Sequence, residues 1–180
     1  HTYSGVRLCI VRVDADDGAV GFGVGGAKAG EREHREHFAR QLIGMDPLMT
    51  EAIWSQLWSP KQFGRRGFET RALASFDLAF WDLRGCVARM PVHRLLGGYR
   101  ERIPTYVAGG YYAPDKTLQD LQAEMAMYVE RGANAVKMKV GAVPIAQDVQ
   151  RVQAVRQAIG PDVKLMVDAN CAYRAYEAIQ

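Results

Sequence analysis

The chain has 180 residues, 48% of them hydrophobic and 24% charged, which is an ordinary globular composition with room for one domain or two small ones. The formal net charge of +3 is too small to indicate nucleic acid or a membrane surface as a partner. No apolar run reaches the length of a membrane span, and no secretory signal is visible. Three widely spaced cysteines, an odd number, are typical of reduced thiols and predict a cytoplasmic protein.

The first hundred residues are predicted to form a β-hairpin followed by helices. Strands are expected over residues 6–13 and 19–26, and helices over residues 31–43, 46–58 and 68–89. The last helix is the longest, and its apolar residues recur at the three- and four-residue spacing of a buried helix face: Leu73, Phe76, Phe80, Trp81 and Val87. We expect the segment "LLGG" at residues 95–98 to end this part of the chain.

Two histidines on the first predicted helix raise the question of a metal site. His34 and His37 lie three residues apart within the charged segment "EREHREH" at residues 31–37. No third ligand is apparent nearby, so a solvated, charged helix face is the favoured interpretation. The glycine-rich segment "GFGVGG" at residues 21–26 does not open a helix at the phosphate-binding spacing, which argues against a nucleotide site.

After residue 102 the pattern changes to alternating strands and helices. Strands are expected over residues 103–110, 134–140 and 162–170, and helices over residues 116–132, 145–160 and from 175 onward. The helices are long enough to cross between parallel strands, so this part is predicted to contain three parallel strands. The boundary between the two parts of the chain is expected near residues 98–102.

The second of these strands carries two lysines on one face. In "AVKMKVG" (135–141), Val136 and Met138 share one face, whereas Lys137 and Lys139 share the other. A central parallel strand has no solvated face, so two lysines there would be costly in an open sheet. In a (β/α)8 barrel that face opens into the active-site mouth at the carboxyl end of the strands. Mutual repulsion and partial burial favour a neutral amine, which would suit a catalytic base.

The third strand places two more polar residues on the corresponding face. In "LMVDAN" (165–170), Asp168 and Asn170 are two residues apart at the carboxyl end of the strand. A carboxylate in that position can ligate a hard divalent cation such as Mg²⁺. Taken alone, the same residues are more typical of a helix cap or of a salt bridge to a neighbouring lysine.

The combination of these segments resembles the enolase superfamily, in its mandelate racemase and muconate lactonizing enzyme branches. The resemblance rests on "VKMKVG", on "LMVDAN" after it and on "FDLAFWDLRGCVARMPVHRLLGG" (76–98) before both, and it covers essentially the whole chain. It implies an α/β fold with an α+β capping domain over residues 1–100, whose first strand is missing. The opening units of a TIM-type (β/α) barrel would follow over residues 101–180.

The predicted barrel is incomplete. A complete (β/α)8 barrel takes roughly 250 residues, whereas this chain ends at Gln180 within the third strand-helix unit. The resemblance also implies further metal ligands, and often a His–Asp pair, on later strands. We therefore expect either a fragment or a sequence that is part of a longer protein.

The resemblance implies a role for each candidate site residue. Lys139, the second lysine of the pair, would be the general base that removes the proton α to a substrate carboxylate. Lys137 would lie near that carboxylate and help to keep Lys139 neutral. Asp168 would be the first Mg²⁺ ligand, and Asn170 would contact the substrate. Mg²⁺ and a lysine cation can stabilise the enediolate that forms when the proton leaves.

A tyrosine after the first barrel strand is a further candidate for substrate binding. The segment "AGGYY" occupies residues 108–112, and its glycines would let a substrate approach the backbone. Tyr111 or Tyr112 would then donate a hydrogen bond to the substrate. The alternative is that these tyrosines pack at the barrel rim, and the sequence leaves both possibilities open. A similar Gly-Gly-Tyr-Tyr segment in hydroxy-acid dehydratases favours dehydration.

The resulting hypothesis is a Mg²⁺-dependent enzyme that removes the α-proton of a hydroxy-carboxylate and then eliminates water from an acid sugar or a tartrate-like acid. The alternatives are a racemase or epimerase, then a cycloisomerase, which share the first step. A further alternative is a truncated superfamily member without catalytic activity. The expected partner is a small-molecule carboxylate, with no nucleic acid or membrane, and the resemblance implies a homo-oligomer.

Overall fold

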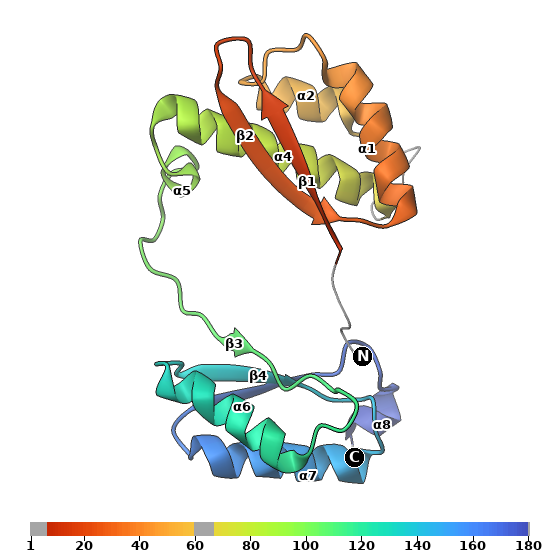
Figure 1. Ribbon diagram of the computed structural model, residues 1–180, viewed down its shortest axis with the longest axis vertical. Coiled ribbons are helices and arrows are strands. Elements are labelled where there is room, and N and C mark those ends of the chain that lie inside the picture. The colour runs from red at the N-terminus through yellow and green to blue at the C-terminus, as the bar shows by residue number, and fades with distance from the viewer. Residues whose placement is uncertain (1–6, 60–66, 180) are drawn as a thin grey trace. The chain divides into compact units, whose positions relative to one another are not determined.

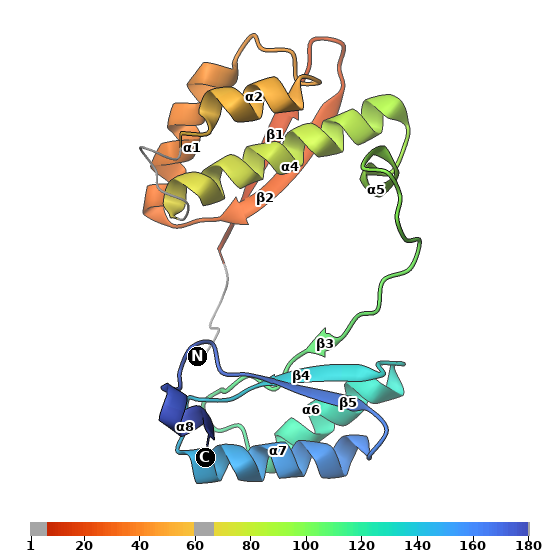
Figure 2. The same ribbon diagram turned by 180° about the vertical axis from the view of Figure 1, so that it is seen from behind.

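The computed structural model describes residues 7–59 and 67–179 of a chain that divides into two compact units. One unit is Val6–Glu101, and the other contains the residues from Arg102 onward. Figures 1 and 2 show the elements of each unit from opposite sides. Within the described residues, no helix combines the length and the apolar character needed to cross a membrane.

The N-terminal unit is an antiparallel hairpin covered on one face by a long helix. Strand β1 (Leu8–Asp14) pairs with β2 (Val20–Gly26) across a turn at Gly18. The helices that follow are α1 (Ala29–Leu42), α2 (Thr50–Leu57), α4 (Phe68–Ala88) and α5 (Val92–Leu95). Helix α4 lies along the hairpin, with α1 and α2 beside it (Figure 2). A hydrophobic core joins β1, α1, α2 and α4 and includes Val11, Phe38, Ile53, Leu57, Leu73, Phe76 and Phe80.

Two glycines explain how closely β2 approaches α4. A Cβ atom added at Gly21 would lie 2.2 Å from the carbonyl oxygen of Ala79, and one added at Gly23 would lie 1.9 Å from that of Ser75. Both distances are far below van der Waals contact, so only glycine allows this packing. The segment "GFGVGG" therefore serves strand-to-helix packing.

The prediction that the charged face of α1 is solvated is wrong at two positions. Glu31 and Arg35 are 1% and 6% exposed, and Arg35 donates hydrogen bonds to the carbonyl of Gly26 and to Ser75 Oγ. Glu31 lies 3.3 Å from Arg35 and so compensates its charge. The pair ties α1 to the end of β2 and to α4, which a helix-face pattern does not reveal because the partners are distant in sequence. His34, on the same helix, lies 3.4 Å from Glu69.

Helix α2 begins later than the sequence predicts, at Thr50 instead of at the Asp46–Pro47 pair. Asp46 forms a turn in which its side chain accepts the N–H of Leu48 and its carbonyl accepts that of Met49. An Asp side chain bonded two residues ahead is an alternative to a helix start. The four-residue helix α5 was not predicted.

The second unit is a parallel sheet with two of its helices on one face. The strands β3 (Val107–Ala108), β4 (Ala135–Lys139) and β5 (Lys164–Asp168) pair in that order. The helices are α6 (Leu118–Glu130), α7 (Ile145–Ile159) and α8 (Ala175–Ile179). Helices α6 and α7 pack on the same side of the sheet (Figure 1). Their core with β4 includes Leu121, Met125, Val136, Met138, Val155 and Ile159. The predicted parallel α/β arrangement is confirmed.

Strand β3 is much shorter than predicted. The sequence predicts a strand over residues 103–110, but only Val107 and Ala108 pair with β4. Pro104 cannot donate a ladder hydrogen bond, and Gly110 turns the chain away with a φ of 60°. The N–H of Gly109 still donates to the carbonyl of Lys137 at 2.9 Å, so the loop after β3 starts beside the lysine pair.

Candidate active site

The lysine pair lies on the face of β4 that is opposite to α6 and α7. Val136 and Met138 are fully buried among the helices, so the strand alternation turns Lys137 and Lys139 to the other face. Lys139 is only 8% exposed. The parallel register pairs Lys139 with Asp168 on β5, which brings a carboxylate beside the two amines.

Asp168 bridges the two lysines. Its Oδ2 atom accepts hydrogen bonds from Lys139 Nζ at 2.5 Å and from Lys137 Nζ at 3.4 Å. Its Oδ1 atom accepts the backbone N–H of Asn170 at 2.9 Å. The hydrogen bond from Lys139 is the largest of the effects that lower the pKa of Asp168 to about 2. The carboxylate is therefore ionised throughout the neutral range.

Lys137 is held as a cation beside Lys139. Desolvation lowers the pKa of Lys137, but the hydrogen bond to Asp168 and the proximity of Tyr106 outweigh it, and the net pKa is raised. Lys137 Nζ also lies 5.1 Å from the centroid of the Tyr106 ring. Lys137 thus remains a cation, and the Asp168 carboxylate between the two lysines is the feature that the sequence pattern did not reveal.

Asn170 reaches the site from the loop after β5 and not from the strand itself. Strand β5 ends at Asp168, and Asn170 follows in the left-handed region with a φ of 47°. The alternation of side chains therefore no longer applies to it. Its Oδ1 atom nevertheless accepts a hydrogen bond from Lys139 Nζ at 2.5 Å. Lys139 is accordingly shared between an acceptor on β5 and one in the loop after it.

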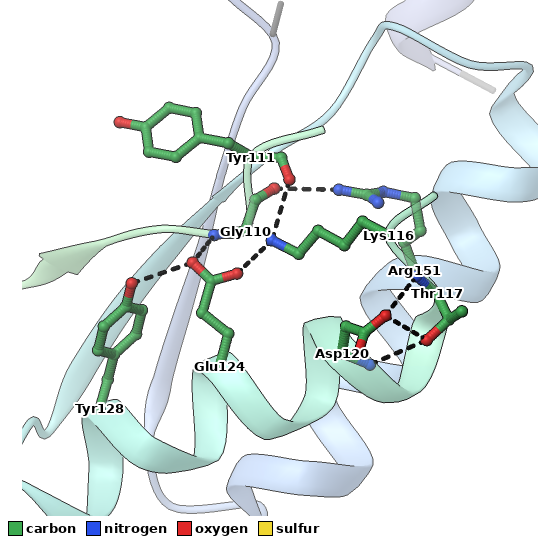
Figure 3. Close-up of polar contacts among 8 residues, drawn as sticks. All are labelled: Gly110, Tyr111, Lys116, Thr117, Asp120, Glu124, Tyr128 and Arg151. Carbon is green, nitrogen blue, oxygen red and sulfur yellow. Dashed lines mark hydrogen bonds and ion pairs between the residues drawn. The ribbon is translucent and has the colours of Figure 1, made fainter. Parts of the chain in front are cut away.

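Tyr111 lies over Lys139, and a partly buried polar network fixes its backbone. The centroid of its ring is 5.9 Å from Lys139 Nζ. Figure 3 shows Glu124 of α6 accepting the N–H of Gly110, while Lys116 donates to both Glu124 and the carbonyl of Tyr111. Tyr128 also donates to Glu124 at 3.0 Å. The loop that carries Tyr111 is therefore held by a hydrogen bond from the N–H of Gly110 and by one to the carbonyl of Tyr111.

Glu124 is ionised in this network. Burial raises its pKa, but the hydrogen bonds from Lys116, Gly110 and Tyr128 together outweigh that effect, so the pKa is lowered. Sequence reasoning missed Glu124, Lys116 and Tyr106. The only available signal was that Glu124 and Tyr128 are four residues apart on one face of the helix after "AGGYY".

The site offers one carboxylate of the kind that binds Mg²⁺. Asp168 has the right donor chemistry for a hard cation, and the Asn170 amide oxygen lies beside it. No group of three or more His, Cys, Asp or Glu side chains that could hold a metal ion occurs within residues 7–59 and 67–179. This part of the chain thus fits one ligand of a Mg²⁺ site and does not form a complete one.

Two segments of the chain match known protein families. Residues 1–97 match the mandelate racemase / muconate lactonizing enzyme N-terminal domain, and residues 120–180 match the enolase C-terminal domain-like family. The chain belongs to the mandelate racemase / muconate lactonizing enzyme family. The enolase superfamily membership predicted from the lysine pair and from "LMVDAN" is therefore confirmed.

Relatives within this family differ in the reactions that their names describe. The chain is 33% identical to an arabinonate dehydratase of Saccharolobus solfataricus over 97% of its own length and 48% of the relative. It is 37% identical to a D-galactarolactone cycloisomerase of Agrobacterium fabrum, over 94% of this chain and 46% of the relative. A racemase of Streptomyces coelicolor, solved with bound magnesium, matches with a TM-score of 0.85 and 34% identity over 96% of this chain and 53% of that one.

The chain spans about half the length of these family members. The lysine pair and Asp168 lie within the matched region, and the remaining length of each relative has no counterpart in this chain. The family relationship thus does not select one reaction for this chain.

Proposed function

We propose that the protein removes the α-proton of a hydroxy-carboxylate with Mg²⁺ as cofactor, and then eliminates water from an acid sugar or a tartrate-like acid. The observation that carries this proposal is the position of Lys139 Nζ, 2.5 Å from both Asp168 Oδ2 and Asn170 Oδ1 at the carboxyl end of the parallel sheet. Ligands of barrel enzymes bind at this end of the strands.

The hydrogen bonds of Lys139 suit a base. A neutral amine has two N–H hydrogens and one lone pair. Once Lys139 has given up a proton, Asp168 and Asn170 would accept its two remaining N–H hydrogens, and the lone pair would be left for a substrate. The amine would take the proton from the α-carbon, and the electron pair of the broken C–H bond would move into the carboxylate.

The neighbouring residues would hold the substrate. Lys137 is a cation on the same face of β4, and it would attract the substrate carboxylate. Tyr111 covers Lys139 and would limit access of water to the amine. When bound, Mg²⁺ would neutralise negative charge on the substrate carboxylate, and Asp168 is the residue of this chain that would hold it.

Dehydration and its alternatives diverge after the first step. In dehydration, the hydroxyl on the β-carbon leaves with a proton as water and the product becomes a keto acid. In racemisation, a proton returns to the opposite face of the same carbon. Cycloisomerisation is the second candidate, because the Agrobacterium relative with that name is the more identical of the two curated relatives described above.

The test follows the α-proton by NMR. The protein, as its gene encodes it, is incubated in D₂O with Mg²⁺ and a panel of aldonic acids, aldaric acids and their lactones. We expect loss of the α-proton signal and formation of a keto acid with at least one acid. Deuterium at the α-carbon without a keto acid would replace dehydration by racemisation, and isomerisation of a lactone would favour the second candidate. Absence of exchange with every compound would leave a non-catalytic family member.

A further inference from the structure

One carboxylate behind the candidate site connects three loops. Asp148 lies in the first turn of α7 and is 3% exposed. Its Oδ1 atom accepts the Tyr112 hydroxyl at 2.5 Å, and its Oδ2 atom accepts the Gly141 N–H at 2.6 Å and the Tyr173 hydroxyl at 3.2 Å. These three donors belong to the loops that follow β3, β4 and β5, respectively.

Each donor is a near neighbour in sequence of a candidate site residue. Tyr112 follows Tyr111 directly, and Gly141 is two residues after Lys139. Tyr173 is three residues after Asn170. Asp148 touches none of these candidate residues in the contacts above, yet it is bonded to the chain close to all three. A shift of its carboxylate would therefore be transmitted to three sides of the site.

Arg151 completes the connection on the β3 side. It is 8% exposed, and its Nε atom lies 3.4 Å from Asp148 Oδ1. It donates a hydrogen bond to the carbonyl of Gly110 at 3.0 Å, and its guanidinium lies 4.0 Å from the centroid of the Tyr112 ring. Figure 3 shows the hydrogen bond from Arg151 to the Gly110 carbonyl. It lies near the hydrogen bonds that Glu124 accepts from the Gly110 N–H and that Lys116 donates to the Tyr111 carbonyl.

The loops after β4 and β5 also meet directly. A Cβ atom added at Gly141, whose φ is 95°, would lie 2.5 Å from the Cβ of Ala172. The two loops are therefore in close contact at the point where Asp148 binds Gly141 and Tyr173. Opening either loop would leave a buried hydrogen-bond donor or acceptor without its partner. Because that costs free energy, this arrangement resists local opening.

We propose that Asp148 is a positioning residue, which fixes the three loops and thereby sets the places of Tyr111, Lys139 and Asn170. Its effect on turnover rests on the function proposed above, whereas its effect on the loops does not. Asp148→Asn replaces one acceptor oxygen by an N–H donor at nearly constant volume, and the variant thus opposes at least one of the three donors.

The first measurement is amide hydrogen exchange of the protein as its gene encodes it, followed by mass spectrometry of peptides. We expect Asp148→Asn to speed exchange about tenfold in the segments 109–113, 141–143 and 171–174. The matched control is Arg156→Met on the same helix. Arg156 binds the carbonyls of Gly160 and Val163 at the other end of α7, so its loss destabilises the helix without touching these loops.

The second measurement is the rate of α-proton exchange with the best substrate, at a temperature well below unfolding. We expect Asp148→Asn to lower kcat about tenfold with a smaller change in KM, because misplaced groups affect the reaction more than binding. Arg156→Met should leave both constants nearly unchanged. Tyr112→Phe and Tyr173→Phe each remove one hydroxyl, and they give the same comparison if Asp148→Asn does not fold.

The outcomes separate the two proposals. Loosening of the three loops together with a lower kcat supports the positioning role. Equal loop exchange in Asp148→Asn and Arg156→Met overturns it, and so does loosening without any loss of turnover. If the unaltered protein exchanges no α-proton at all, the proposed function fails. The loop exchange then decides by itself whether Asp148 connects the three loops, and additivity of Asp148→Asn with Tyr112→Phe would contradict that connection.

Discussion

Lys139 and Asp168 are register partners on adjacent parallel strands, and their side chains meet at 2.5 Å. Because residues paired across parallel strands point to the same face, this contact follows from the register of β4 and β5. A substitution of the proposed base therefore also removes a hydrogen bond of the proposed metal ligand, and the reverse is true as well.

Replacing the proposed base should abolish proton exchange. Lys139→Met keeps the length of the side chain and removes the amine, so we expect the exchange of the substrate α-proton with solvent deuterium to fall by about 10³-fold or more. Lys164→Met is the matched control, since Lys164 is an exposed lysine at the start of β5. Full exchange in a folded Lys139→Met protein would remove Lys139 from the role of base.

Replacing the proposed metal ligand should weaken Mg²⁺ binding. Asp168→Asn keeps the shape of the side chain but removes its charge, and we expect the dissociation constant for Mg²⁺ to rise by about tenfold or more. Isothermal titration calorimetry on the protein as its gene encodes it provides the measurement. Asp162→Asn, at an exposed position before β5, should leave the constant unchanged. An unaltered affinity in Asp168→Asn would exclude Asp168 from the metal site.

The network around Glu124 should make the stability of the second unit depend on pH. Because the pKa of Glu124 is lowered in the folded state, its contribution is present above the pKa of the unfolded chain and is lost as the pH falls through the folded pKa. At neutral pH we expect Glu124→Gln to cost about 1 kcal/mol, a modest value because the group is partly solvated. Urea unfolding at several pH values measures this.

The difference between the two proteins should vanish in acid, when the carboxyl of the unaltered protein is also neutral. Glu130→Gln, at the exposed end of the same helix, serves as the control and should show no such pH dependence. A stability difference that persists unchanged into acid would show that the charge of Glu124 is not what holds the loop.

The hydroxyl of Tyr112 should lose its proton at an unusually high pH. Desolvation, followed by its hydrogen bond to Asp148, raises its pKa to about 12. Its contribution to stability is therefore fully present below the ordinary tyrosine pKa and is lost as the pH rises through the folded value. An ultraviolet titration of tyrosinate should lose its latest component in Tyr112→Phe, and Asp148→Asn should move that component to lower pH. A latest component that survives in Tyr112→Phe would contradict the assignment.

Local sequence patterns determined much of the second unit. Alternation along "AVKMKV" placed Val136 and Met138 in the core and Lys137 on the other face, because strand geometry is a property of neighbouring residues. The three parallel strands followed from the lengths of the helices between them. In the first unit, Leu73, Phe76 and Phe80 of the predicted long helix are buried, as their spacing indicates, whereas Val87 near its end is 43% exposed.

Local patterns failed where chain direction changes or partners are distant. The strand "IPTYVAGG" is only two residues long because Pro104 and the positive φ of Gly110 limit it. Asn170 lies beyond its strand in a left-handed conformation. A charged helix face was expected to be solvated, yet Glu31 and Arg35 are buried, because the groups that satisfy them come from β2 and α4.

The sequence by itself thus determined the family, the parallel strands and the face on which the lysines lie, since each depends on residues close together in the chain. Only the tertiary structure decided that Asp168 bridges both lysines, that Glu124 holds the Tyr111 backbone and that Asp148 joins three loops. Hydrogen bonds between groups 7 to 36 residues apart depend on the register of strands and the packing of helices. No periodic pattern encodes those distances.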